Sequence, residues 1–531
     1  MRNVSVYYYA RISQRMSSKE TIMSIKTVVV RETVERLAPI TRRRFLQGSA
    51  IAGLAAATVG PGEYIAAFAL GNELNAFNMR RGASDLVIQP VLMHEIPRRI
   101  KGGSWRNWGG VHTDEAAKQE MDRISQELKQ LCGSAEFGVQ SLPVVKVANP
   151  QQTDVLKDIK ADALVVYAAG GWMDTFGALV DLGKPVVVFL RQSSGPYYLW
   201  HEIVHSRFLR SHTDQLSHPV MDVNDVVVDD TNKMLWRLRA LYGLKNTLGR
   251  RIVCIGGPGG WSYPQAPALA RERFQLDMVT VAIRELNAMI EASRKDGALM
   301  EQCKQKAKRY LKPKDVSLVT TKEAVTEAFL LKKLFDDLMT KHDACAITTN
   351  ACMGSYAGIM PCLTLGLVND SGQMAYCESD FVVIPSGILM HFISGKPTYL
   401  CNPTYPHDGR MLFAHCAAPR RMDGKNLEPV DIVTHYESDH GAASHVNFRR
   451  GQLITVLKPD FEAKNWLAFT GTVIDTPELP ACRAQIELKL NADTQDVLAN
   501  MRGFHCMLAY GEYTRDVAYA AKKVGINVQI L

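Results

Sequence analysis

The sequence lacks several features that would place it in a class at once. It has no CxxC pair among its 11 cysteines, no internal repeat and no low-complexity tract. Beyond residue 69 it also has no run of roughly 20 consecutive apolar residues, the length that crosses a bilayer. Hydrophobic residues make up 47% of the chain and charged residues 22%, as in ordinary globular proteins. We therefore expect a folded globular protein whose mature chain has no stable membrane span.

A basic surface for nucleic acid is also missing. The formal net charge is +8, but residues 1–69 hold ten lysines and arginines against four acidic residues. The remaining 52 basic and 50 acidic residues nearly balance, and they form no basic stripe interleaved with aromatic side chains. Such a stripe is the usual footprint of nucleic-acid binding. A nucleic-acid partner is therefore not expected.

Residues 1–69 form a basic and then apolar leader. Arginines at 42–44 precede an uncharged stretch at 48–62, and small residues at 67 and 69 flank a phenylalanine. This order resembles a twin-arginine export signal, with a short buried helix after a basic turn as the alternative. The resemblance implies a twin-arginine export machinery as partner and a periplasmic or otherwise extracytoplasmic location. It also suits an odd number of cysteines, because proteins exported in this way fold first, with thiols reduced and any metal bound.

The length of the chain predicts about three domains. Apolar runs without polar alternation, separated by helix-length segments, predict a parallel sheet covered on both faces. The runs in question lie at 86–93, 144–148, 163–170 and 185–190. The predicted division is an α/β domain at 85–248, a second α/β domain at 250–367 and a β-rich domain at 368–531.

The second predicted domain opens with a buried strand at 250–255 and a glycine-rich loop at 256–260. The spacing of the loop fits neither GxGxxG nor a P-loop, so it is interpreted as a flexible turn. Long, charged amphipathic helices are predicted at 276–310 and 322–341, followed by another buried strand within 344–354. These elements complete a second α/β pattern.

The most conspicuous short motif is HExxH, at His201, Glu202 and His205. On a helix, two histidines four residues apart share a face and can bind zinc, with the glutamate as base. His212 misses the longer metzincin spacing by one residue, and no convincing third ligand follows. The favoured interpretation is a helix with substrate-facing or solvated histidines, and a zinc hydrolase is the alternative.

Another candidate site begins at Glu378 and Asp380, one residue apart after an apolar stretch. On a strand both carboxylates would point to the same face. A helix-like run at 384–393, a Gly-Lys-Pro turn and a short apolar strand then lead to Asn402. In an α/β protein this order returns distant side chains to one end of a sheet.

Five strings carry a family resemblance. They are CESD at 377–380, AHCAAP at 414–419, HYESDHGAA at 435–443, CRAQIELKL at 482–490 and the tail FHCMLAYGEYTRDVAYAAKKVGI at 504–526. In this order they resemble the L-fucose/L-arabinose isomerase family, especially its L-fucose-isomerase-like branch. The resemblance implies two parallel-sheet α/β domains followed by a β-rich one, and a homo-oligomer, either a trimer or a hexamer.

The resemblance also implies an aldose–ketose isomerase that binds Mn²⁺ or a similar divalent ion and works through an enediolate. A divalent cation chelates adjacent sugar oxygens, while carboxylates move a proton between C1 and C2. Carried over by position, Glu378 is a metal ligand and acid–base group, and His505 is the late metal-binding histidine. Asn402 stands where the family has its second carboxylate. An amide can coordinate a cation but cannot transfer a proton at neutral pH.

Other side chains are assigned to the same site. Asp380, Asp408 and Glu437 are candidates to replace the missing acid, and Asp380 is assigned a catalytic role beside Glu378. Substrate binding is assigned to His415, His435, Glu437 and Trp261. Three functions stay open: an exported sugar isomerase, a carbohydrate-binding protein without turnover on the same scaffold, and a metal-dependent lyase or epimerase that uses the same enolate chemistry.

Overall fold

The computed structural model describes residues 82–98, 101–102, 110–209, 221–350 and 354–531. Contacts group these residues into two compact units. The N-terminal unit contains Ala83–Asn246 and Arg515–Gly525, and the C-terminal unit contains Thr247–Thr514 and Ile526–Leu531. The division into three domains stays a prediction. The leader at 1–69, for which an export signal is predicted, lies outside the described residues.

The N-terminal unit is built on a parallel sheet. Its strand order is β2-β1-β4-β5-β6. The first part of β1 pairs with β2, and the last part of β1 pairs with β3 on the same side. The strands are β1 (Leu86–Met93), β2 (Val139–Ser141), β3 (Val145–Val147), β4 (Ala163–Ala168), β5 (Val186–Leu190) and β6 (Val226–Val228). The central strands β4 and β5 are buried throughout, as expected of apolar runs that are covered on both faces. The strands predicted from these runs are confirmed.

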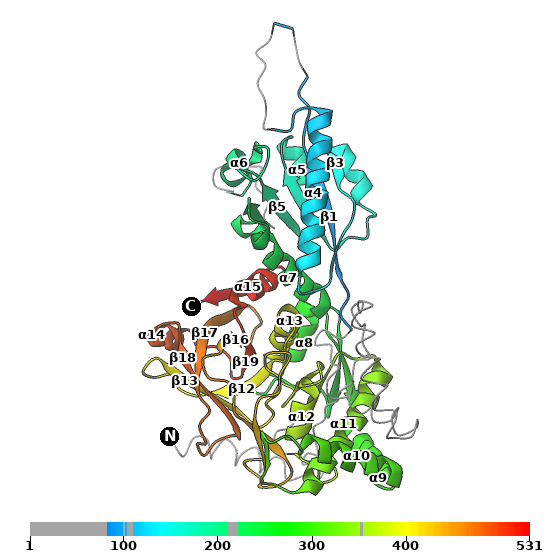
Figure 1. Ribbon diagram of the computed structural model, residues 1–531, viewed down its shortest axis with the longest axis vertical. Coiled ribbons are helices and arrows are strands. Elements are labelled where there is room, and N and C mark those ends of the chain that lie inside the picture. The colour runs from blue at the N-terminus through cyan, green and yellow to red at the C-terminus, as the bar shows by residue number, and fades with distance from the viewer. Residues whose placement is uncertain (1–81, 99–100, 103–109, 210–220, 351–353) are drawn as a thin grey trace, which may run out of the picture. The chain divides into compact units, whose positions relative to one another are not determined.

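Helices surround this sheet in the usual alternation of an α/β fold. They are α4 (Asp114–Ser134), η1 (Pro150–Leu156), α5 (Met173–Val180), α6 (Trp200–Ile203), η2 (Val204–Phe208), η3 (Val223–Asp225), α7 (Thr231–Thr247) and α15 (Thr514–Lys522). Figure 1 shows α4 as the long helix of this unit. The side chain of Thr113 accepts a hydrogen bond from the backbone of Ala116 and so caps the first turn of α4.

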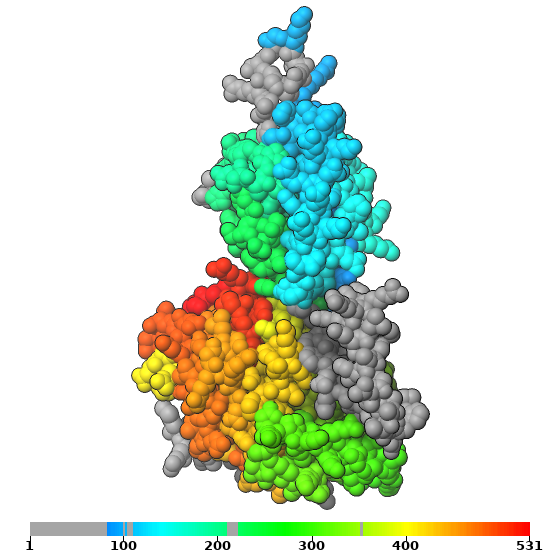
Figure 2. All heavy atoms as spheres, in the orientation of Figure 1, coloured from blue at the N-terminus to red at the C-terminus, as the bar shows by residue number. Residues whose placement is uncertain are grey.

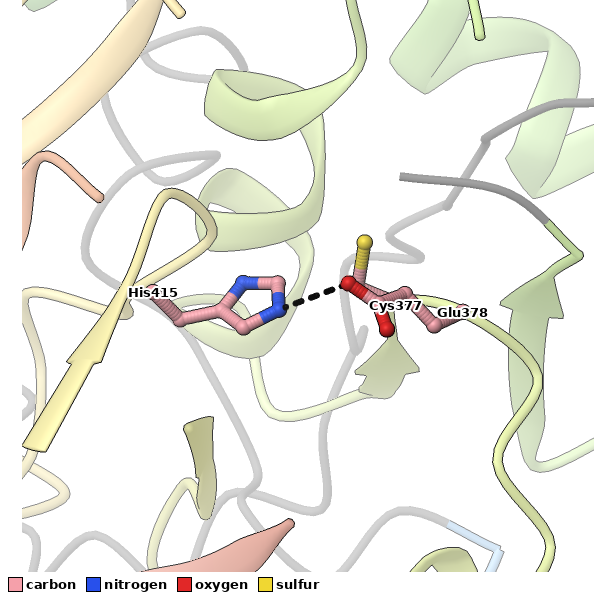
Figure 3. A group of neighbouring side chains, drawn as sticks. All are labelled: Cys377, Glu378 and His415. Atoms are coloured by element: carbon pink, nitrogen blue, oxygen red, sulfur yellow. Dashed lines mark ion pairs between the residues drawn. The ribbon is translucent and has the colours of Figure 1, made fainter. Parts of the chain in front are cut away.

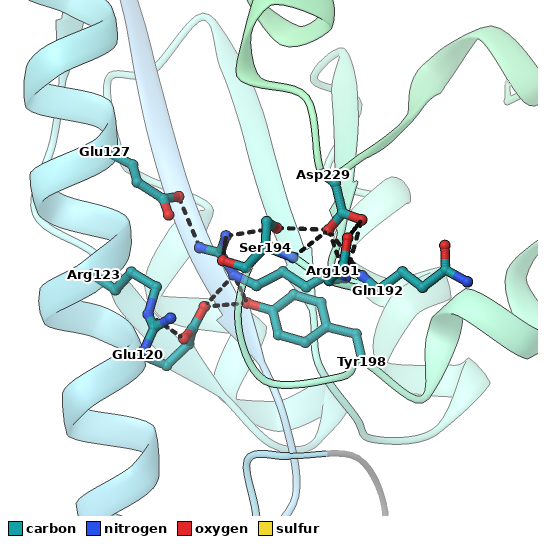
Figure 4. Close-up of polar contacts among 9 residues, drawn as sticks. Glu120, Arg123, Glu127, Arg191, Gln192, Ser194, Tyr198 and Asp229 are labelled. Carbon is teal, nitrogen blue, oxygen red and sulfur yellow. Dashed lines mark hydrogen bonds and ion pairs between the residues drawn. The ribbon is translucent and has the colours of Figure 1, made fainter.

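A buried ion-pair network joins α4 to the segment after β5 (Figure 4). Arg191 donates from Nε to Glu120 at 2.6 Å and from Nη2 to Glu127 at 2.8 Å. The same loop is held from the other side, where the carboxylate of Asp229 accepts hydrogen bonds from the backbone N–H groups of 192–194. The guanidinium of Arg191 would be buried without partners if this network were absent, and the network therefore fixes the conformation of the loop.

The HExxH motif does not lie on a regular α-helix. His201 and Glu202 belong to the short α6, whereas His205 lies in the π-helical turn η2. A π-helical turn changes the rotation between residues, so four-residue spacing no longer keeps two side chains on one face. Neither histidine belongs to any group of potential metal ligands found among the described residues. The expected helix is therefore present but irregular, with an α-helical turn followed by a π-helical one.

A second parallel sheet, with strand order β11-β10-β7-β8, lies in the C-terminal unit. Its strands are β7 (Arg251–Ile255), β8 (Asp277–Val281), β10 (Ala346–Thr349) and β11 (Met374–Tyr376). The accompanying helices are α8 (Ala266–Phe274), α9 (Ile283–Arg294), α10 (Gly297–Tyr310), α11 (Lys322–His342), α12 (Cys362–Asn369) and α13 (Ile384–Ser394). The predictions at 322–341 and 384–393 are confirmed by α11 and α13.

The predicted helical run at 276–310 is wrong in its first part. It begins with strand β8, whose DMVTV sequence is rich in β-branched residues. The remainder divides into α9 and α10, because the side chain of Asp296 accepts hydrogen bonds from the backbone of Ala298 and Leu299 and starts a new helix.

A closed antiparallel barrel forms the β-rich part of the C-terminal unit. Its strands are β12 (Tyr399–Pro403), β13 (Arg410–His415), β16 (Leu453–Pro459), β17 (Asn465–Asp475), β18 (Ala484–Leu490) and β19 (Cys506–Tyr510). The order is β16-β19-β12-β13-β18-β17, and the pairing of β16 with β17 closes the ring. The parallel strand β20 (Asn527–Ile530) adds to β17. A mixed α/β fold with parallel sheets followed by a β-rich part is confirmed.

Smaller elements complete the C-terminal unit. Strands β9 (Val316–Leu318), β14 (Val430–Val433) and β15 (Ala443–Val446) form a separate three-stranded sheet, and α14 (Thr494–Asn500) precedes β19. Figure 2 shows the part of the barrel that contains β17 and β18 in orange and the segment around α9 and α10 in green on one face of this unit. In the described part of the chain, none of the helices combines the length and apolar character that crossing a bilayer requires.

Candidate metal centre

The candidate site lies at the point of the parallel sheet of the C-terminal unit where the order of successive strands reverses. The chain adds β8 on one side of β7 and β10 on the other, so the loops after β7 and β10 diverge at this point. Ligands of open α/β sheets bind outside the carboxyl ends of the strands at such a switch. The segment that follows β11 carries Glu378 to the same end of the sheet.

Glu378 lies in a turn, and Asp380 forms an isolated parallel β-bridge with Gly259, so the two acids do not share a regular strand as predicted. Both Glu378 and Ser379 have positive φ angles, 68° and 46°, which are unfavourable for residues with a Cβ atom. Two backbone hydrogen bonds support this turn: Gly259 donates to Ser379, and Phe381 donates to Gly259, each at 3.1 Å. The glycine-rich loop at 256–260 is therefore a fixed partner of the acidic turn, and its interpretation as a flexible turn is wrong.

The barrel brings three more side chains to this place. Cys401 on β12 pairs with Cys506 on β19, so the register continues with Asn402 opposite His505. Asn402 also pairs with Ala414 on β13, next to His415 at the end of that strand. Antiparallel pairing thus places residues that are 103 apart in sequence, 402 and 505, at one end of the barrel.

Glu378 lies between two buried histidines. Nε2 of His415 is 3.4 Å from Oε1 of Glu378, and Nε2 of His505 is 3.2 Å from Oε2 of the same carboxylate. Figure 3 shows the imidazole of His415 facing this carboxylate, with the side chain of Cys377 beside it. The ligand atoms of Cys377, Glu378 and His415 lie within 4.8 Å of one another.

Several polar atoms in this cluster are buried but have no hydrogen-bond partner among the described residues. They are Oε2 of Glu378, Oδ1 of Asn402, both ring nitrogens of His415 and Nε2 of His505. Leaving a buried polar atom unsatisfied costs about 1–3 kcal/mol. Atoms of this kind that face a common space are expected where a ligand supplies the missing interaction.

Asp380 acts on the centre through His505. Nδ1 of His505 donates a hydrogen bond of 2.7 Å to Oδ2 of Asp380. Because a carboxylate only accepts, Nδ1 carries a proton, and Nε2 is directed to the side of Glu378. A carboxylate behind a histidine is the usual orienting arrangement in metal sites.

The charges of the cluster are strongly coupled. Burial opposes ionisation of Glu378, but His505 and His415 outweigh it and hold the pKa of Glu378 well below its ordinary value. Burial also disfavours the cationic form of His505, yet Glu378 and Asp380 raise the pKa of His505 to about 9. The carboxylates therefore create a buried place that favours positive charge.

Aromatic rings cover one side of His505. The ring of Trp261 stacks on Phe504, with centroids 5.1 Å apart and planes at 10°, and meets His505 edge-on at 5.4 Å. Trp261, which was assigned to substrate binding, thus lies beside the centre. Sequence reasoning missed Phe504 and Cys377, although each directly precedes an assigned ligand in the chain.

The structure separates two other assigned residues from Glu378. His435 and Glu437 lie 2.9 Å apart, and their ligand atoms group with the thiol of Cys416. Asp408, a candidate for the missing acid, is 90% exposed in its side chain and pairs with His407. Of the three candidate acids, Asp380 alone contacts a residue of the Glu378 centre in the described interactions.

A divalent cation fits the donor set around Glu378. The unpaired atoms are a carboxylate oxygen, an amide oxygen and imidazole nitrogens, which together suit Mn²⁺, Zn²⁺ and similar ions. Glu378, Asn402, His415 and His505 would hold it. His505 is already oriented for this role by Asp380.

No family model matches the chain, and no curated protein shows significant sequence similarity to it. The likeness to sugar isomerases therefore depends on the five strings, and the geometry of the centre is the independent support for a metal-dependent function.

Proposed function

We propose that this protein is an exported, divalent-metal-dependent enzyme of the aldose–ketose isomerase type, acting on a small carbohydrate. The proposal rests on Glu378 and His505, which lie 3.2 Å apart, and on Asn402, which the barrel register places opposite His505; each of the three has a buried ligand atom without a hydrogen-bond partner among the described residues. They come from a sheet edge and from one end of a barrel that are far apart in sequence. Such convergence has a cost in stability, and a bound cation would offset it.

The residues of the centre divide into holding and orienting roles. Glu378, Asn402, His415 and His505 bind the cation, and Asp380 fixes the tautomer of His505 through the 2.7 Å hydrogen bond. Mn²⁺ is our first candidate, because oxygen and imidazole donors suit it. A bound divalent cation would polarise two adjacent substrate oxygens and stabilise the negative charge that develops on them.

Few side chains of this centre can transfer a proton. Glu378 is the acid that faces the unpaired donors, and it is only 5% exposed. Its conjugate base would move a proton between neighbouring carbons of a bound sugar. Asn402 cannot share this work, and the carboxylate of Asp380 is already engaged with His505. A single acid–base group therefore has to serve both carbons.

The aromatic pair supports a carbohydrate as substrate. Trp261 and Phe504 present stacked rings beside His505, and Phe504 is 38% exposed. An apolar ring surface next to charged and amide groups suits a sugar, which has an apolar face of C–H groups and a polar rim. The substrate class otherwise depends on the resemblance to the isomerase family.

A second candidate function is retention of a carbohydrate without turnover. Asn402 favours it, because replacing an anionic ligand by an amide removes a proton-transfer group and weakens the hold on a hard cation. A lyase or epimerase that uses the same enolate chemistry is a further alternative, since it needs only one acid–base group at a single carbon.

Solvent exchange separates these functions. The full-length protein with Mn²⁺ is incubated in D₂O with a panel of pentoses, hexoses and deoxyhexoses, and deuterium at C2 and ketose formation are measured by NMR. An isomerase gives both, and an epimerase gives exchange without ketose. Saturable binding by calorimetry without exchange across the panel would favour the binding protein and count heavily against the isomerase.

Asn402→Asp tests the departure from the family pattern. If the variant binds Mn²⁺ more tightly and gains an isomerisation that the parent lacks, the natural protein is a binder or a divergent enzyme. If it loses an existing activity, the amide belongs to the mechanism. Asn447→Asp, on the partly exposed segment after β15, is the matched control for the added charge.

A further inference from the structure

We propose that the C-terminal unit contains a second, sulfur-rich metal site that binds Zn²⁺ through Cys416, Cys482, His435 and Glu437. The proposal does not depend on the function assigned to the Glu378 centre. Three segments supply the four side chains. Cys416 directly follows β13, His435 and Glu437 lie between β14 and β15, and Cys482 lies before β18.

The ligand atoms already lie close together. The thiol of Cys416, the imidazole of His435 and the carboxylate of Glu437 are within 4.8 Å of one another. The thiol of Cys482 is 3.7 Å from Oε1 of Glu437, and Cys482 packs against the buried cluster that contains Cys416. With Zn–S near 2.3 Å and Zn–N near 2.0–2.1 Å, ligand atoms around a tetrahedral zinc are separated by roughly 3.3–3.8 Å. Small side-chain adjustments would therefore complete the site.

His435 gives independent evidence for a ligand. Its side chain is fully buried, and Nε2 has no hydrogen-bond partner among the described residues. Nε2 nevertheless lies 2.9 Å from Oε2 of Glu437, which is also buried and without a hydrogen bond. Two polar atoms that are this close without hydrogen-bond geometry are arranged like two ligands of one ion.

The surroundings orient both donors. Nδ1 of His435 is hydrogen-bonded to the hydroxyl of Ser438 at 2.9 Å, which leaves Nε2 directed at Glu437. The backbone N–H of Arg483 donates to the sulfur of Cys416 at 3.4 Å. Partners behind a metal ligand fix its direction and tune its basicity, and they are a regular part of metal sites.

The donor set selects zinc over the ions suited to the Glu378 centre. Thiolate ligands favour Zn²⁺ and other soft or borderline ions, whereas oxygen-rich sites favour Mn²⁺ or Mg²⁺. Each thiol would release its proton to the solvent on binding Zn²⁺. A closed four-ligand site is typical of structural zinc, and here it would tie the segments after β13 and β14 to the start of β18.

Cobalt substitution tests the proposal directly. The full-length protein is purified under reducing conditions, freed of metal with a chelator and titrated with Co²⁺, and the sulfur-to-cobalt charge-transfer band is recorded in the near ultraviolet. Zn²⁺ should displace Co²⁺ and remove the band. We expect Cys416→Ser and His435→Gln to lower Zn²⁺ affinity by roughly 100-fold or more, and Ser438→Ala by roughly tenfold, because Ser438 only orients a ligand.

Matched controls locate the site. Cys377→Ser changes a thiol beside Glu378, and His445→Gln changes a histidine of the neighbouring β15; neither should alter the band. Glu378→Gln should lower binding of Mn²⁺ but leave the cobalt–sulfur band intact. If Cys416→Ser does not fold, Cys482→Ser replaces it, since Cys482 is partly exposed.

Two results would overturn the inference. One is a reduced wild-type protein that shows no sulfur-to-cobalt band at saturating Co²⁺. The other is a band that persists unchanged in both Cys416→Ser and Cys482→Ser but disappears in Cys377→Ser, which would assign the thiolate ligand to the Glu378 centre.

Discussion

Each unit contains a buried cluster of charged side chains, and the two clusters differ in completeness. In the N-terminal unit, Arg191 and Glu120 are almost fully buried, and Arg191 donates to Glu120, Glu127 and Ser194. In the C-terminal unit, Glu378 and His505 are buried as deeply, yet each has an atom without a hydrogen-bond partner among the described residues.

The difference teaches how to read a buried charge. A buried ion pair repays its desolvation only when additional hydrogen bonds satisfy its remaining donors and acceptors. The guanidinium of Arg191 meets this condition within the protein, whereas Oε2 of Glu120 has no hydrogen-bond partner among the described residues and lies 3.3 Å from Nε of Arg123. We interpret the Arg191 network as structural on the ground of its satisfied guanidinium. The Glu378 cluster leaves several of its polar atoms without hydrogen bonds, and the cation proposed above would supply the missing interactions.

The largest expected effect concerns the Arg191 network. Arg191→Met should reduce the free energy of unfolding by about 3–5 kcal/mol, because it leaves Glu120 buried without its partner. Urea unfolding of the full-length protein measures this. Arg123→Met is the control: its partly exposed guanidinium lies 3.3 Å from Glu120, and its loss should cost less than about 1 kcal/mol. Equal losses of unfolding free energy in Arg191→Met and Arg123→Met would contradict the central structural role of Arg191.

The converse is expected at Glu378. Glu378→Gln should lower affinity for Mn²⁺ by roughly 100-fold or more, beyond the effect of losing a residue that only orients a ligand. The metal-free protein should also lose some stability, because the lowered pKa of Glu378 means that its ionised form stabilises the folded state through His505 and His415. Glu487→Gln, on β18 of the same barrel, is the matched control, and calorimetric titration is the measurement. A large loss of stability with unchanged affinity would make Glu378 a structural residue.

His94 offers a third kind of buried group, because burial outweighs the influence of the charges near it. It is 1% exposed and neither ring nitrogen has a hydrogen-bond partner among the described residues. Burial, with a contribution from Lys146, lowers the pKa of His94 from 6.5 to about 4. The unfolded chain therefore binds a proton below about pH 6.5 that the folded protein does not, so the stability contributed by neutral His94 is lost as pH falls through this window.

The expected loss is about 2 kcal/mol between pH 7 and pH 5. It is measured as the difference in unfolding free energy between the wild type and His94→Gln at each pH, since other groups titrate equally in both. A difference that does not change with pH would show that His94 keeps an ordinary pKa.

The smallest effect is expected at Asp380. Asp380→Asn keeps an oxygen that can accept the hydrogen bond from His505 but removes the charge, so Mn²⁺ affinity should fall by roughly tenfold. Asp380→Ala, which removes the acceptor as well, should have the larger effect. Equal losses for the two variants would mean that only the charge matters. An unchanged affinity in both would leave Asp380 without a positioning role.

Much of the fold could be predicted, because its signals are local. Apolar runs predicted β1, β4 and β5, and the helix-like run at 384–393 before a Gly-Lys-Pro turn predicted α13. The structure adds that Gly395 ends this helix in a left-handed conformation. Strand β8 was missed, since five residues beside a long helix carry a weak signal.

The candidate site could be predicted only in part, because it depends on register between distant segments. Glu378 and His505 were assigned from a resemblance, and the structure brings them together. His415 and Cys416 are neighbours that serve different clusters, since successive residues of an extended chain point in opposite directions. No local sequence pattern predicts the left-handed turn at Glu378. This turn depends on the backbone hydrogen bonds that join Ser379 and Phe381 to Gly259.

The last part of the chain belongs to both units in turn. In α15, Asp516 pairs with Arg239 at 2.6 Å and Tyr519 donates to Asp225 at 2.8 Å. The chain then returns to the barrel, where β20 pairs with β17. Each unit is therefore built from segments that are not continuous in sequence, so no single cut in the chain separates the two units. A mechanical pull on the C-terminus would reach the barrel first and load the N-terminal unit only after β20 had been peeled away.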